Sequence, residues 1–174
     1  MKNNKNKCTI CNSPTYLEVK YDTWEVLRCN SCSHAFSSNI TKPISNIYDK
    51  SYFQKNWFLH PNLNLFGIIE KDIHERFGLN ARIHDLGCGN GNLLEYLYQK
   101  GYRNLHGSDI VSCLLSSIVN KVKFTQIDML DIKETYAYDV VVSIANIEHL
   151  SDMNAYMLKL RQMLVPEGHN IYNK

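Results

Sequence analysis

Two kinds of hydrophobic pattern alternate along the chain from residue 65 onward. Apolar residues spaced three or four apart predict helices over residues 65–77, 93–97, 111–119 and 152–164, the last with Ser151 as its N-cap. Short apolar runs between them predict strands over residues 82–86, 105–110, 122–127, 138–144 and 169–172. Apolar strands that alternate with helices indicate a parallel sheet covered on both faces. The pattern therefore predicts an α/β fold with a Rossmann-like, doubly wound parallel sheet.

The first forty residues differ, because β-forming residues stand there between two pairs of cysteines. Cys8 and Cys11 form the first pair, and Cys29 and Cys32 form the second. Two residues between the cysteines of a pair let both thiolates bind one ion, and two such pairs complete a tetrahedron. A segment of about forty residues buries too little surface to fold alone, so a metal must stabilise it. The spacing predicts a ribbon with a structural zinc ion bound by these four cysteines.

Composition narrows the class of protein. The chain has 174 residues, of which 44% are hydrophobic and 21% charged, as expected for one globular domain with a small module. A net charge of +2 is too small to indicate a phosphate-binding surface, and no apolar run approaches the length of a membrane span. No secretory signal follows the Lys- and Asn-rich start, so we expect a cytoplasmic protein whose paired cysteines bind zinc and do not form disulfides. His34 is expected at the surface or in packing, and Cys88 and Cys113 as small buried residues.

These patterns divide the chain into three parts. We expect a zinc ribbon over residues 1–40, an aromatic-rich connector over 41–62 and a ligand-binding domain over 63–174. We interpret the aromatic residues of the connector as packing between the two modules, with a role in lining a pocket as the alternative. They are Tyr48, Tyr52, Phe53, Trp57 and Phe58.

A glycine-rich loop follows the first strand of the larger domain. Gly87, Gly89 and Gly91 predict a tight turn from strand to helix, where backbone N–H groups can approach a ligand closely. Asp85 stands two residues before the first of these glycines. The G-x-G-x-G spacing differs from the G-x-G-x-x-G of dinucleotide sites, and the lysine of a P-loop is absent. The loop therefore needs further residues to define its ligand.

Acidic residues at the ends of the next two strands supply that definition. Asp109 can accept hydrogen bonds from both hydroxyls of a ribose, which suits NAD and S-adenosylmethionine equally. Asp128 can accept from an adenine amino group, with Met129 beside the ring. Because ligands bind at the carboxyl ends of parallel strands, these residues predict an adenosine site along one edge of the sheet.

With these residues, the chain resembles class I S-adenosylmethionine-dependent methyltransferases. The resemblance rests on residues 85–91, 107–110, 128–129, 143–150 and 164–168, and it covers about residues 65–172. It implies that the three glycines lie under the methionine part of the cofactor, that Asp109 holds the ribose, and that Asp128 and Met129 hold the adenine. Asp85 and Ile110 complete the expected cofactor-binding residues.

The order of the modules also resembles a narrower group, the zinc-ribbon methyltransferases of bacterial sugar and surface-polysaccharide pathways. There too, paired cysteines and a Tyr-rich connector precede the cofactor fold. This resemblance implies methyl transfer to a small-molecule acceptor, such as a nucleotide sugar or a polysaccharide precursor. Two alternatives stay open: a ribosomal RNA methyltransferase, and a non-catalytic cofactor-binding or scaffold protein. The low net charge and the lack of Lys/Arg clusters count against nucleic acid, and no membrane partner is expected.

The segment after the fourth strand of the sheet supplies the candidate for catalysis. His149 is the expected general base, because its ordinary pKa of about 6.5 suits proton transfer near neutral pH. Glu148 is the other candidate, and a bracing role for His149 at the next helix is the alternative.

The end of the chain departs from the family pattern. Members of this fold usually have seven strands, and this chain stops within the fifth, so we expect a C-terminally truncated domain that lacks the last strands. Its fifth strand would then be an exposed edge through which a homo-oligomer could form.

Overall fold

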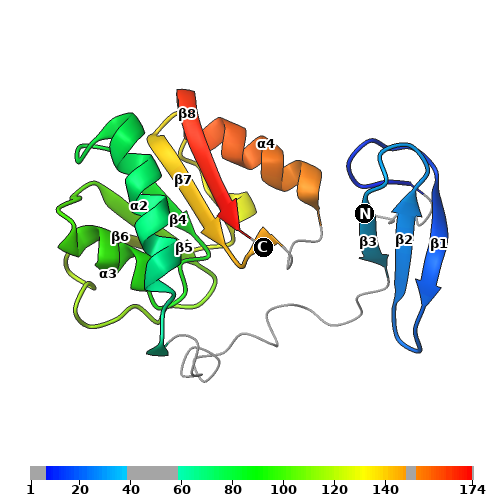
Figure 1. Cartoon of the computed structure of the whole chain (residues 1–174), viewed down its shortest axis with the longest axis horizontal. Coiled ribbons are helices and arrows are strands. Elements are labelled where there is room, and N and C mark those ends of the chain that lie inside the picture. Colours follow the sequence, from blue (N-terminus) through cyan, green and yellow to red (C-terminus); the bar gives the residue numbers. More distant parts are fainter. Residues whose placement is uncertain (1–6, 39–58, 148–151, 174) are drawn as a thin grey trace.

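The computed structural model describes residues 7–38, 59–147 and 152–173, which form two separate sheets (Figure 1). The smaller sheet belongs to the cysteine-rich segment, and the larger one to the α/β domain. Several residues singled out in the sequence lie outside the described residues. These are the connector aromatics, Glu148, His149 and Ser151.

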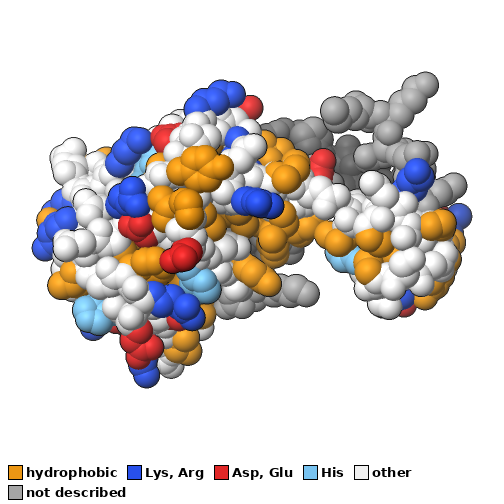
Figure 2. Space-filling view, turned by 90° about the horizontal axis from the view of Figure 1, so that it is seen from above, with side chains coloured by type: hydrophobic (Ala, Val, Ile, Leu, Met, Phe, Trp, Pro, Cys, Tyr) orange, Lys and Arg blue, Asp and Glu red, His pale blue; other side chains and the backbone are white. Residues whose placement is uncertain are grey.

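The cysteine-rich segment folds as a three-stranded antiparallel sheet in the order β1-β2-β3. Its strands are β1 (Thr15–Lys20), β2 (Glu25–Cys29) and β3 (Ala35–Ser38). A turn joins β1 to β2, where the rings of Tyr21 and Trp24 stack with their centroids 4.1 Å apart. The described part of this module buries little besides Leu27 and two of its cysteines. Apolar side chains accordingly reach its surface (Figure 2), as expected for a module too small to have a core of its own.

The larger domain is built on a five-stranded parallel sheet in the order β6-β5-β4-β7-β8. Its strands are β4 (Ile83–Leu86), β5 (Leu105–Asp109), β6 (Lys123–Gln126), β7 (Tyr138–Ile144) and β8 (Leu164–Asn173). Its helices are α2 (Leu63–Phe77), α3 (Asn92–Gln99), α4 (Met153–Met163) and the short 3-10 helix η3 (Met129–Asp131). The predicted parallel α/β sheet is confirmed.

Both faces of this sheet are covered, which explains why its central strands are apolar throughout. On one face, Ile83 and Val140 pack in a core with residues of α2 and α3, among them Ile73 and Leu97. On the other face, Val141 lies in a second core with residues of α4. Within the described residues, none of the helices combines the length and the apolar character that a membrane-spanning helix needs.

Local signals account for most of the helix ends. The side chain of Asn62 accepts a hydrogen bond from Leu65 N and caps α2, which ends at Gly78 with a φ of 66°. The N-cap of α4 is Asp152 in place of the predicted Ser151, because the Asp152 carboxylate accepts from Ala155 N at 2.9 Å. Met157, one of the apolar residues within the predicted helix, is exposed.

The predicted helix over residues 111–119 is wrong, since residues 111–115 form no helix or strand and residues 116–120 form turns. The backbone amide of Leu115 donates its hydrogen bond to Asn90 O of the glycine loop at 2.9 Å, and therefore not to a carbonyl of its own segment as in a helix. Ile118 is buried at the bend, whereas Val119 is 52% exposed. The helical spacing of the apolar residues here reflects packing against the glycine loop.

The strand β8 is longer than predicted and contains an irregularity. It begins directly after α4, and its pairing with β7 shifts between Leu164, opposite Tyr138, and His169, opposite Val140. Glu167 takes up the extra residues with a φ of 67°. In the described part of the sheet, β8 is one of the two edges.

A buried polar cluster joins the central strands. His84 Nε2 lies 2.8 Å from Ser108 Oγ, and His106 Nδ1 lies 2.5 Å from the Tyr138 hydroxyl. Burial lowers the pKa of His84 to about 2 and the pKa of His106 to about 4, so both rings are neutral at pH 7. These histidines therefore act as neutral hydrogen-bonding groups of the sheet.

Candidate functional site

The strand order places the expected ligand crevice at the carboxyl ends of β4 and β7. From β4 the chain proceeds to β5 and β6 on one side, and then crosses to β7 and β8 on the other. Open parallel sheets bind their ligands where the strand order reverses in this way. The loop from β4 to α3, which carries the three predicted glycines, lies at this point.

The glycine loop has the backbone conformation that its sequence predicts. Gly87, Gly89 and Gly91 have φ values of 68°, 56° and 83°, in the left-handed region that glycine adopts without strain. Gly87 N donates to Ser108 O at 2.8 Å, which ties the loop to the end of β5. At Gly91, a Cβ would also lie 2.6 Å from Ile118 Cδ1. The loop is thus held close to the sheet, and it leads directly into the first turn of α3.

Asp109 meets this loop at the end of β5. Its Oδ2 accepts a hydrogen bond from Gly89 N and its Oδ1 accepts one from Val111 N, both at 2.9 Å. Burial raises the pKa of Asp109, while these backbone hydrogen bonds act in the opposite direction. Each carboxylate oxygen retains a further lone pair that can accept from a ligand hydroxyl. The structure therefore brings together two of the predicted cofactor residues, Asp109 and Gly89.

Asp85 is a buried carboxyl with no hydrogen-bond partner among the described residues. It is 4% exposed and stands in β4 beside Gly107 of β5. Burial, with a smaller contribution from the negative charge of Asp109, raises the pKa of Asp85 to about 8. An unpartnered buried acid beneath a ligand-binding loop is costly to the fold, and it fits a donor or cationic group of a ligand.

Replacing Asp85 by asparagine is expected to stabilise the ligand-free protein by about 4 kcal/mol at pH 7. The folded-state pKa of about 8 lies above the ordinary value of 3.8. The carboxyl therefore contributes its full stability below pH 3.8 and loses it as the pH rises towards 8. Urea unfolding at pH 4 and pH 7.5 should show the gain only at the higher pH.

The exposed Asp131 of η3 provides the matched control, because Asp131→Asn should leave stability unchanged at both pH values. The same Asp85→Asn substitution should weaken ligand binding. Equal stability of the wild type and Asp85→Asn at pH 7.5 would contradict this prediction, because it would show that the Asp85 carboxylate already has a stabilising partner.

The residues predicted at the adenine end lie further along the same edge. Asp128 follows β6 by two residues and so does not end that strand as expected. It is exposed, and its side chain accepts from Leu130 N as the N-cap of η3. Met129 is half-buried and Ile110 is 38% exposed. Because Asp109 pairs with Gln126 of β6, these residues extend the crevice from β5 past β6.

One residue that contacts the glycine loop was not singled out from the sequence. Asn146 follows β7, and its Cγ lies 2.8 Å from the position that a Cβ on Gly87 would occupy. Its Nδ2 lies 3.4 Å from Leu86 O, at the end of β4. Asn146 stands within the 143–150 segment of the resemblance, but a polar residue after a strand does not reveal which neighbouring loop it will contact.

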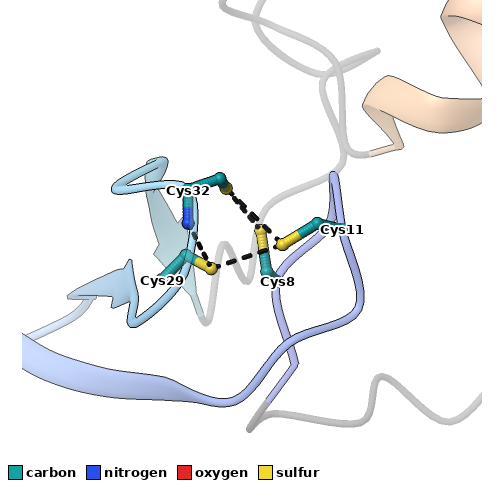
Figure 3. Close-up of side chains that lie close together, drawn as sticks. All are labelled: Cys8, Cys11, Cys29 and Cys32. Carbon is teal, nitrogen blue, oxygen red and sulfur yellow. Dashed lines mark hydrogen bonds between the residues drawn. The ribbon is translucent and has the colours of Figure 1, made fainter.

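The four predicted cysteines converge in the small module, with their sulfurs facing one another (Figure 3). All four Sγ atoms lie within 4.8 Å of one another. Cys8 Sγ lies 3.6 Å from Cys32 Sγ, and Cys11 Sγ lies 3.5 Å from Cys29 Sγ. Tetrahedral zinc with Zn–S bonds of about 2.3 Å requires sulfurs about 3.8 Å apart. The cluster therefore has the size of a four-cysteine zinc site.

Backbone amides support this cluster. Ile10 N lies 3.4 Å from Cys8 Sγ, and Ser31 N lies 3.3 Å from Cys29 Sγ. Such N–H groups stabilise thiolates, which are the form that binds a metal. His34, by contrast, stacks on Phe36 with the ring centroids 5.6 Å apart, in agreement with its expected packing role. Cys88 is buried as predicted, and Cys113 is half-buried.

Solved structures with a similar fold include several proteins assigned as methyltransferases. A protein from Methanococcus maripaludis, assigned as an S-adenosyl-L-methionine-dependent methyltransferase, aligns with a TM-score of 0.59 and 19% identity over 78% of this chain. A protein from Galdieria sulphuraria, assigned as a sarcosine dimethylglycine methyltransferase, aligns with a TM-score of 0.57 and 18% identity over 63% of it. The (4+2)-cyclase SpnF aligns with a TM-score of 0.50 and 16% identity over 59% of it.

These similarities concern the fold, and they cover only part of the solved proteins. The chain spans 66% of the Methanococcus protein, 46% of the Galdieria protein and 43% of SpnF. No curated protein matches the chain significantly. The profile of the methyltransferase domain family, however, matches residues 46–172, which is well over half of the chain. With its parallel sheet and its glycine loop at the switch point, the chain belongs to the methyltransferase domain family.

Proposed function

We propose that the chain binds S-adenosylmethionine and transfers its methyl group to a small-molecule acceptor. The observation that carries this proposal is the pair of carboxyl groups beside the glycine loop. Asp109 accepts from the loop amide of Gly89 and keeps lone pairs for a ribose, while Asp85 is buried with no hydrogen-bond partner in the part of the chain that the structure describes. Family membership and the switch-point position of the crevice support the same cofactor.

The order of these residues along the edge gives the cofactor a direction. The adenine would lie past β6, near Asp128 and Met129, with Ile110 beside it. The ribose would lie at Asp109 on β5, and the methionine part over the loop after β4, where Asp85 can accept a hydrogen bond from a donor group. The sulfonium would then lie towards β7, on the side from which an acceptor must approach.

Transfer of the methyl group is an in-line displacement, so the acceptor atom must lie about 3–3.5 Å from the methyl carbon. A hydroxyl or carbon acid also needs a base to take its proton. His149 remains the predicted base, with Glu148 as the second candidate. For the acceptor we propose a nucleotide sugar or polysaccharide precursor, on the strength of the zinc-ribbon module that precedes the domain. The net charge of only +2 supports a small acceptor over RNA.

The four cysteines would hold a zinc ion in this reading. Their sulfur spacing fits tetrahedral zinc, and four protein ligands leave no position for a water molecule. The ion would therefore stabilise the small module and take no part in methyl transfer.

Isothermal titration calorimetry of the full chain tests the cofactor. S-adenosylmethionine and S-adenosylhomocysteine should each bind with a stoichiometry of one, while NAD and ATP should not bind. Transfer of a labelled methyl group to a panel of nucleotide sugars, with ribosomal RNA as the comparison, then tests the acceptor. Binding of NAD without binding of S-adenosylhomocysteine would contradict the proposal.

A further inference from the structure

Asn146 lies at the point where the strand order reverses, between β4 and β7. It follows β7, the strand next to β4, and its side chain is half-buried against the first glycine of the loop. The position of a Cβ on Gly87 would be 2.8 Å from Asn146 Cγ and 3.1 Å from its Oδ1. Ala145, directly before it, has a φ of 48°, which is costly for a residue other than glycine. The backbone is thus held in a strained turn that brings this amide onto the glycine loop.

The two ends of the Asn146 amide have different surroundings. Its Nδ2 lies 3.4 Å from Leu86 O and 3.3 Å from Ser143 Oγ. A backbone carbonyl can only accept, so the contact with Leu86 O fixes the nitrogen on that side. Its Oδ1 accepts no hydrogen bond from the described residues. It is also not one of the fully buried polar atoms that lack a partner, so it is not closed off from a ligand. Within the described residues, this carbonyl oxygen therefore keeps its lone pairs unused, and it lies beside the glycine loop where the ligand is expected.

The proposed direction of the cofactor brings its reactive end to this wall. Adenine past β6 and ribose at Asp109 leave the methionine part on the loop after β4. The sulfonium then comes near the junction of β4 and β7, where Asn146 contacts Gly87. This step rests on the proposed function.

We propose that the side-chain oxygen of Asn146 distinguishes the cationic cofactor from its neutral product. The sulfonium of S-adenosylmethionine carries a positive charge that S-adenosylhomocysteine has lost. A carbonyl dipole pointing at that charge attracts the cofactor, and the attraction is strong in a site that excludes water. The same dipole gains nothing from a neutral thioether, so Asn146 favours exchange of product for fresh cofactor.

The test compares two substitutions that alter the dipole in opposite ways. Asn146→Leu keeps the size of the side chain and removes the oxygen, so it should weaken S-adenosylmethionine binding about fivefold and leave S-adenosylhomocysteine almost unchanged. Asn146→Asp adds negative charge and should shift the ratio of the two affinities towards S-adenosylmethionine. Calorimetry with both ligands measures this ratio, and thermal unfolding checks that each variant is folded.

Asn104→Leu is the matched control. Asn104 also donates from its Nδ2 to a backbone carbonyl, that of Asn80 at 3.0 Å. It directly precedes β5, however, and so lies at the amino ends of the strands, away from the expected ligand site. Its replacement should leave the affinity ratio unchanged. If both Asn146 variants change the two affinities by the same factor, or not at all, the inference is wrong while the proposed function stands. If the wild type binds neither ligand, the proposed function itself fails, and the inference with it.

Discussion

Replacement of Asp109 by alanine is expected to lower the affinity for S-adenosylhomocysteine by about a hundredfold, because two hydrogen bonds to a charged acceptor are worth about 3 kcal/mol together. The substitution removes the proposed acceptors of both ribose hydroxyls. It also removes the carboxylate that accepts from Gly89 N and Val111 N, so the glycine loop keeps only its backbone hydrogen bonds to Ser108 O at the end of β5. Calorimetry and the ligand-induced rise in melting temperature both measure this loss.

Two further variants separate the ribose contact from the tie to the loop. Asp109→Asn retains one acceptor oxygen and the shape of the side chain, so it should lose less affinity than alanine. Asp131→Ala, on the exposed 3-10 helix near the same edge, should bind as the wild type does. Full affinity in Asp109→Ala would remove Asp109 from the cofactor site and with it the proposed direction of the ligand.

Zinc removal is expected to unfold the small module and leave the larger domain intact. Structural zinc contributes about 10–16 kcal/mol of apparent binding energy in comparable four-ligand peptides, and the described part of this module buries few apolar side chains that could replace it. The protein should contain one zinc per chain, and Cys29→Ser should abolish it. Loss of dispersed amide signals from residues 7–38 alone, in NMR spectra of the full chain, is the expected result.

Cys113→Ser serves as the control, because Cys113 lies in the larger domain outside the four-cysteine cluster. This variant should retain its zinc and both sets of amide signals. A wild-type protein without zinc, or joint unfolding of both modules in Cys29→Ser, would count against an independent zinc-stabilised ribbon.

Several features of the site could be predicted because they depend on local chemistry. The glycines at 87, 89 and 91 predicted a tight turn from strand to helix, and all three have positive φ values in the loop between β4 and α3. The spacing of the cysteines predicted their convergence, since a pair separated by two residues has few ways to face one ion. The carboxylate of Asp109 was expected at a strand end, and β5 ends there.

Other features could not be predicted because they depend on which distant segments come together. The helix expected over residues 111–119 does not form, since the outward hydrogen bond from Leu115 N to Asn90 O replaces a helical one. The same limit applies to Asn146, whose contact with Gly87 joins segments about sixty residues apart.

By itself, the sequence determined the alternation of strands and helices, the parallel sheet, the glycine turn and the four-cysteine cluster. Each follows from the period of apolar residues or from the spacing of a few side chains, and both depend only on residues close together in the sequence. Only the tertiary structure decided that Asp85 is buried with no partner among the described residues, that Asp109 accepts from Gly89, and that Asn146 lies against Gly87. Burial and partnership of polar groups depend on the packing of strands far apart in the chain, and no local pattern encodes that packing.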